Sequence, residues 1–111
     1  MDREPHFVSW EGRPSRRLAP GVEATIVSGE KLMLSRVVIQ PGAVVPVHQH
    51  PHEQFGFVIS GGGEFTIGEE TRTVKEGDYY TIPGGVLHGV VGGPAGGEFM
   101  DIFSPPREDY K

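Results

Sequence analysis

The sequence predicts an all-β protein, either a double-sheet jelly roll or a small barrel. Short segments rich in branched and aromatic residues recur along the chain, and clusters of turn-forming residues separate them. The 111 residues include 17 glycines and 10 prolines, well above the roughly 7% and 5% of ordinary proteins. Apolar residues nowhere repeat with the 3.6-residue period of a helix, and regularly spaced short strands are typical of jelly rolls and barrels.

The expected strands follow the apolar segments in order. Residues 22–27 and 31–40 flank a Ser-Gly turn and should form a hairpin, since both are rich in branched residues. Glycines are expected to end a strand in a turn at residues 60–63 and to make residues 92–97 a flexible loop. The other expected strands are residues 44–47, 55–59, 64–67, 71–74, 79–82, a strand that begins at His88, and residues 98–103.

A single domain is expected, because 111 residues are too few for two separate cores. Residues 1–21 should form an N-terminal arm laid across the barrel, because Pro14 and Pro20 exclude a long helix and Trp10 offers an anchor. Residues 22–111 would then form the barrel and its C-terminal tail.

A homodimer is also predicted. A small jelly roll leaves sheet edges exposed, and the arm around Trp10 offers a means of covering a second subunit's edge.

The composition limits the partners and the kind of site. A formal net charge of −5 disfavours nucleic acid as a partner, because binding to phosphates draws on a basic surface. The sequence contains neither a secretory leader pattern nor a run of eighteen apolar residues, which predicts a cytoplasmic protein without a membrane segment. Because the chain has no cysteine, any metal site must use nitrogen and oxygen ligands.

A histidine-rich segment in the middle of the chain has the spacing of a metal site. His48 and His50 are two residues apart, and alternate residues of a strand share one face, so both imidazoles can reach one ion. Gln54 follows beyond an expected turn at Pro51 and offers a carboxamide oxygen, and His88 is a distant fourth candidate. His52 has the same parity but falls in the turn after Pro51, which favours a role beside the ligands or in solvent.

Two motifs in the same region resemble those of single-domain cupins. The first motif is a glycine, five residues, His-x-His, three or four residues, an acid, six residues and a glycine. It is matched with one change, Gln54 in place of the acid, by Gly42, His48, His50, Gln54 and Gly61. The second is a glycine, five residues, Pro-x-Gly, two residues, His, three residues and Asn; it is matched by Gly77, Pro83, Gly85 and His88, with Gly92 in place of the Asn. The resemblance covers residues 42–92 and implies a double-stranded β-helix barrel, commonly dimeric.

The resemblance also implies a ligand set of His48, His50, Gln54 and His88 for one divalent ion, whether Ni, Mn, Fe, Zn or Co. Gln54 departs from the family pattern, in which the third ligand is usually Glu. A neutral oxygen ligand leaves the ion its full charge, which makes it a stronger Lewis acid and suits an acidic substrate.

The final strand and the tail resemble a narrower group, the cupins that open unsaturated uronates released by pectin and alginate lyases. The matching residues are Asp101, Phe103, Ser104, Pro105, Pro106, Arg107, Glu108 and Asp109. Asp101 alternates with Phe99 and Phe103, so it is expected to point inward with them, and a buried acid among aromatic residues suggests function.

The resemblance implies a reaction in which a Δ4,5-unsaturated uronate monosaccharide becomes a linear 4-deoxy-5-keto uronate. Asp101 would be the acid/base, Arg107 would bind the substrate carboxylate and Phe103 would pack against the sugar ring. Two other functions fit the sequence: a sugar-binding or small-ligand-binding cupin without catalysis, and a metal-dependent dioxygenase. An inward acid favours the uronate reaction over a binding module, which has no need of one.

Overall fold

The computed structural model describes residues 5–111, which form eight strands and one turn of 3-10 helix. The strands are β1 (Arg16–Ala19), β2 (Val22–Ser28), β3 (Met33–Ile39), β4 (Val44–His48), β5 (Glu53–Ile67), β6 (Glu70–Lys75), β7 (Tyr79–Ile82) and β8 (His88–Ser104), and the 3-10 helix is η1 (Glu108–Tyr110). Every strand pairing is antiparallel. The predicted all-β class is therefore confirmed.

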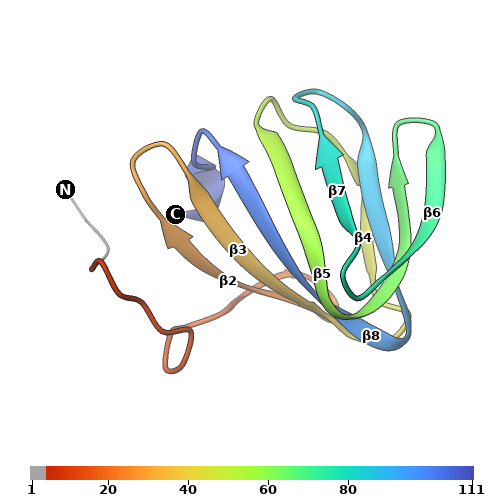
Figure 1. The fold of residues 1–111 in the computed structure, drawn as a ribbon, viewed down its shortest axis with the longest axis horizontal. Helices are drawn as coiled ribbons and strands as arrows, with labels where there is room; N and C mark the ends of the chain where they lie inside the picture. The colour runs from red at the N-terminus through yellow and green to blue at the C-terminus, as the bar shows by residue number, and fades with distance from the viewer. Residues whose placement is uncertain (1–4) are drawn as a thin grey trace.

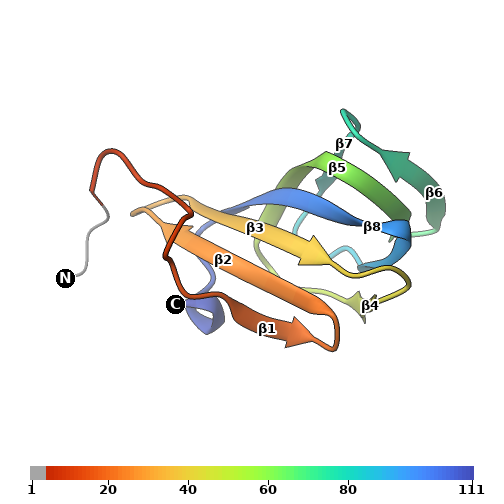
Figure 2. The ribbon, with the colours of Figure 1, turned by 90° about the horizontal axis from the view of Figure 1, so that it is seen from below.

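Two long strands, β5 and β8, run through both halves of the molecule. The first half of β5 pairs with β7 and with the second half of β8, where β3, β2 and β1 follow in order. The second half of β5 pairs with β6 and with the first half of β8, which also pairs with β4. Both long strands bend where the two halves meet (Figure 1), and Figure 2 shows β1, β2, β3 and β8 side by side. The bends fold one sheet into two layers, which is the expected jelly roll.

The two layers enclose an apolar core because side chains alternate along each strand. Burial alternates through β3, where Met33 and Val37 point inward, and through the end of β8, where Phe99 and Phe103 do so. Two polar residues, Ser35 and Asp101, occupy inward positions on these same strands. Polar groups on an apolar face mark the part of the core where a site is to be sought.

The structure confirms the hairpin expected between residues 22–27 and 31–40, since β2 and β3 pair from Val22 opposite Ile39 to Ser28 opposite Met33. It also adds a strand that the sequence did not indicate. β1 lies within the expected arm and pairs with β2, so regular structure begins before residue 22. The start of the described chain extends away from both layers instead of lying across them (Figures 1 and 2).

The turn expected at residues 60–63 is wrong, because β5 continues through it. The pairing of β5 with β8 shifts register twice in this stretch, and Gly61 has a φ of 64°. A side chain on Gly62 would collide with the backbone carbonyl of Val74 on β6. These glycines serve a bend and a close approach between strands, and such sites need the same residue as a turn does.

The flexible loop expected at residues 92–97 is wrong for the same reason. This segment lies inside β8 at the matching bend, where Gly97 is opposite Gly61 and Gly92 is opposite Gly63. Gly96 has a φ of 70°, which residues with a side chain rarely adopt.

Between residues 5 and 111, no helix has the length and apolarity needed to cross a membrane.

Candidate functional site

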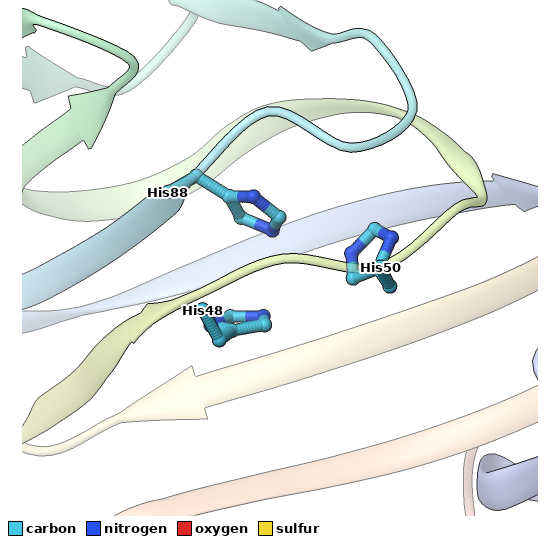
Figure 3. A group of neighbouring side chains, drawn as sticks. All are labelled: His48, His50 and His88. Atoms are coloured by element: carbon cyan, nitrogen blue, oxygen red, sulfur yellow. The ribbon is translucent and has the colours of Figure 1, made fainter.

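Three histidines converge where β4 ends and β8 begins (Figure 3). His48 is the last residue of β4 and His88 the first of β8, and the two are directly opposite in the strand pairing. His50 reaches them from the segment that leads into β5. The ring centroids are 4.4 Å apart for His48 and His88 and 4.8 Å apart for His50 and His88. One ring nitrogen of each residue lies within 4.8 Å of the others, so the group can hold a metal ion.

The other ring nitrogen of each histidine faces a backbone carbonyl. Nδ1 lies 2.7 Å from the Pro46 oxygen in His48, 3.1 Å from the His52 oxygen in His50 and 2.9 Å from the Val86 oxygen in His88. A carbonyl only accepts hydrogen bonds, so in the neutral form of each ring Nδ1 carries the proton and Nε2 carries a lone pair. Histidine ligands of metal ions are oriented in this way.

Burial keeps two of these imidazoles in the neutral form that binds metals. It lowers the pKa of His88 to about 4, and it is also the main cause of a lowered pKa at His50, where the Arg107 charge acts in the same direction. Among the described residues, Nε2 of His88 is one of the few buried polar side-chain atoms without a hydrogen-bond partner.

Gln54 adds an oxygen to this group. Its side chain is buried on β5, and Oε1 lies 3.0 Å from Nε2 of His50. The Gln54 side chain also hydrogen-bonds to Asp101. Because a carboxylate only accepts hydrogen bonds, the amide N–H of Gln54 is the donor. With the amide held in this way, the Gln54 oxygen and the His50 lone pair are two acceptors facing each other. A cation between them resolves this conflict, so the residues present fit a divalent ion.

Asp101 is buried beside this cluster, on the inward face of β8, as its alternation with aromatic residues predicted. Tyr80 donates a hydrogen bond of 2.5 Å from its hydroxyl to Oδ1 of Asp101. Gly56 lies opposite Asp101 on β5, and a side chain there would collide with Asp101 and with the Tyr80 ring. Burial raises the pKa of Asp101 to about 6, against the opposing effects of Tyr80, Gln54 and the Arg107 charge.

Arg107 is held by the tail that follows β8. Its Nε and one Nη donate to the two carboxylate oxygens of Asp109, at 3.2 and 2.8 Å. The guanidinium carbon lies 3.9 Å from the centre of the Tyr110 ring and 5.3 Å from that of Phe103. Asp109 takes the edge of the guanidinium formed by Nε and one Nη. The other edge, formed by the two Nη atoms, remains available to a second anion.

Most of these side chains line one cavity between the two layers. Of the predicted site residues, the walls include His48, Gln54, His88, Asp101, Phe103 and Arg107. The ring of His50 packs edge-on to those of His88 and Phe103. The structure thus brings together every residue that the sequence placed in the site. His52 stays outside the cavity walls, and its ring packs against that of His50.

Sequence reasoning assigned no role to four residues of this site, although one of them, Asp109, matched the signature of the tail. Tyr80, Ser35 and Tyr110 line the cavity, and Asp109 orients Arg107. Side chains alternate along a strand, so the adjacent Tyr79 and Tyr80 face opposite ways, and the structure shows that Tyr80 faces inward. Nothing in the local sequence indicated that this tyrosine contacts an acid 21 residues away.

The fold and the histidine cluster define the class of protein. Residues 35–103 match the cupin domain family, and the chain belongs to that family. It is 34% identical over 99 residues to the pectin degradation protein KdgF of Dickeya dadantii, an alignment that covers 87% of this chain and 90% of that protein.

Two solved structures are similar over almost the whole chain. An RmlC-like cupin from Shewanella frigidimarina superposes with a TM-score of 0.92 at 29% identity and covers 100% of both chains. KdgF from Halomonas sp. superposes with a TM-score of 0.90 at 30% identity and covers 97% of this chain and 100% of that one.

Proposed function

We propose that this protein is a metal-dependent enzyme that opens the ring of Δ4,5-unsaturated uronate monosaccharides and yields linear 4-deoxy-5-keto uronates. The observation that carries the proposal is the position of Asp101, a buried acid that lines one cavity with Arg107, His48 and His88. Similarity to two KdgF proteins, one of them named for pectin degradation, supports the same class of acidic sugar as substrate.

In this proposal His48, His50, Gln54 and His88 hold one divalent ion, whether Ni, Mn, Fe, Zn or Co. Three neutral imidazoles and a carboxamide oxygen form a ligand set that many divalent ions accept. When bound, the ion supplies positive charge that stabilises developing negative charge on an oxygen of the substrate. Because none of these ligands carries a negative charge, that positive charge is not neutralised by the protein.

The chain's own residues bind the substrate and move its proton. The free end of the Arg107 guanidinium binds the substrate carboxylate, and Phe103 packs against the sugar ring. Asp101 accepts the proton of the C1 hydroxyl as the bond between C1 and the ring oxygen breaks, and the electrons of that bond remain on the ring oxygen at C5. Asp101 then returns the proton to C4, which leaves an aldehyde at C1 and a ketone at C5. The reaction is an isomerisation and consumes no oxidant or reductant.

Purified protein offers a direct test with two readouts. Metal analysis should find one divalent ion per chain, and unsaturated galacturonate should lose the ultraviolet absorbance of its conjugated enol ether faster than it does spontaneously. A His48→Ala, His50→Ala double variant should lose both properties, whereas His6→Ala, at an exposed histidine before β1, should keep both. Equal metal content in the double variant and the parent would contradict the metal site. Metal binding without any acceleration would contradict the reaction and favour a binding module.

A further inference from the structure

One polar side chain in the cavity is not used by the proposed reaction. Ser35 lies on the inward face of β3 and has no solvent exposure. Its hydroxyl is one of the few buried side-chain polar atoms, among the described residues, that lack a hydrogen-bond partner. A buried hydroxyl without a partner is unfavourable for folding, so such a group in a binding cavity points to a ligand that completes it.

The position of Ser35 relative to Asp101 indicates which part of a ligand it meets. The two residues are directly opposite in the pairing of β3 with β8, and both line the cavity. Side chains that face each other across antiparallel strands have Cβ atoms about 4.5–5.5 Å apart. The hydroxyl of Ser35 and the carboxylate of Asp101 therefore face neighbouring atoms of one ligand.

We propose that Ser35 binds the C2 hydroxyl of the sugar and makes the enzyme sensitive to the configuration at C2. This inference rests on the proposed function, in which Asp101 takes the proton of the C1 hydroxyl. Ser35 is the cross-strand neighbour of Asp101. On the sugar ring, the hydroxyl that neighbours the C1 hydroxyl is the one on C2, so this is the group that Ser35 meets. The carboxylate of the sugar lies at the other end of the ring and is bound by Arg107.

The chemistry of the substrates makes this proposal specific. The double bond removes the stereocentres at C4 and C5, so the unsaturated sugars derived from galacturonate and mannuronate differ in configuration only at C2. A hydroxyl donor and acceptor on one side of C2 distinguishes the two, whereas Arg107 and the metal ligands contact groups that the two sugars share.

The experiment compares both sugars as substrates of the parent, of Ser35→Ala and of Ser35→Cys. Ser35→Ala should lower kcat/KM for the preferred sugar by about 3- to 10-fold, the effect of one neutral hydrogen bond, and should bring the ratio between the sugars closer to one. Ser35→Cys keeps the size of the side chain but donates only weakly, so it should behave like Ser35→Ala. Ser60→Ala, at an exposed serine on β5, is the control and should leave the ratio unchanged.

Stability without substrate distinguishes a binding role from a structural one. Removing a buried hydroxyl that has no partner should leave the Tm of Ser35→Ala unchanged or raise it, and metal content should be unchanged. A lower Tm with an unchanged ratio between the sugars would overturn the proposal, as would an equal fall in kcat/KM for both sugars. If the parent turns over neither sugar, the proposed function fails as well, so the two failures are distinguishable.

Discussion

Gln54 explains, at the scale of single residues, how an acid can be buried beside a metal site. Its oxygen faces the histidine cluster, and its amide hydrogen-bonds to Asp101. A glutamate at this position would offer no donor and would place a second negative charge next to Asp101. Gln54 in place of the usual glutamate therefore suits the buried Asp101, because only an amide can offer an oxygen to the histidine cluster and a hydrogen-bond donor to Asp101.

Replacing the acid is the most direct test of its role. Asp101→Asn keeps the shape of the side chain but removes its ability to accept a proton, so kcat should fall by about 10²–10⁴, the range for a lost general acid or base. Metal content and substrate binding should persist, which metal analysis and calorimetry would measure. Glu69→Gln, at an exposed position, is the control. Turnover by Asp101→Asn at the parent's rate would show that the mechanism is wrong.

Tyr80 is expected to position Asp101 without contacting the substrate's reacting atoms. Tyr80→Phe removes the hydrogen bond to the carboxylate but keeps the ring, which packs against Phe65 with centroids 4.4 Å apart. A hydrogen bond to a charged group contributes about 1.5–3 kcal/mol, so kcat should fall at least about tenfold while KM stays near that of the parent. Tyr79→Phe is a matched control, because Tyr79 is 84% exposed on the same strand. A change in KM alone would contradict the positioning role.

At the scale of elements, the tail after β8 forms one wall of the site. η1 carries Asp109 and Tyr110, which together hold the Arg107 guanidinium against Phe103. The side chain of Asp109 is largely exposed, so this ion pair contributes little to stability. Its consequence is geometric: the fork of Arg107 is oriented with one end free.

Arg107→Ala should therefore weaken substrate binding. A carboxylate clamp contributes to the ground state and the transition state alike, so KM should rise about 10- to 100-fold with a smaller change in kcat. Arg107→Lys keeps the charge but lacks the planar fork, and it should recover only part of the loss. Steady-state kinetics with unsaturated galacturonate would measure both variants. Arg72→Ala, at an exposed arginine on β6, is the control, and an unchanged KM in Arg107→Ala would contradict the clamp.

Elements with local signals were predictable from the sequence, whereas the long bent strands were not. The β2–β3 hairpin follows from two branched segments around a short turn, and such contacts are close in sequence. β5 and β8 each appeared as two segments divided by glycines, because a bend in a strand and a turn between strands need the same backbone freedom.

The same distinction applies to the site. Spaced motifs predicted the histidines, Gln54, Asp101 and Arg107, and all of these lie together in the structure. Ser35 and Tyr80 could not be assigned, because their importance comes from strand register. Ser35 is opposite Asp101 on β8, and Tyr80 reaches Asp101 over Gly56, the residue of β5 that pairs with both. A single sequence does not specify which strands pair.

At the scale of the whole molecule, an apolar area covers the outer face of the layer that contains β7, β5 and β8. Phe55 and Phe57 on β5 are 49% and 40% exposed. Phe57 is directly opposite Tyr79 on β7 and Met100 on β8. Large aromatic side chains gathered on one exposed face mark an interaction surface. This face offers the expected homodimer a second route besides the arm.

We expect a symmetric homodimer in which these outer faces pack against each other, since a twofold interface uses the same surface on both subunits. Phe57→Asp places a charge in the centre of this face and should convert the dimer to a monomer, as measured by light scattering across a tenfold dilution series.

Phe7→Asp tests the alternative interface, the N-terminal arm, because Phe7 is 95% exposed on the segment before β1. A monomeric parent at the highest concentration would contradict the dimer. A dimeric Phe57→Asp together with a monomeric Phe7→Asp would assign the interface to the arm. Because the cavity is lined by inward residues of a single chain, monomeric Phe57→Asp should retain its metal ion and most of its activity, so dimerisation and catalysis should separate.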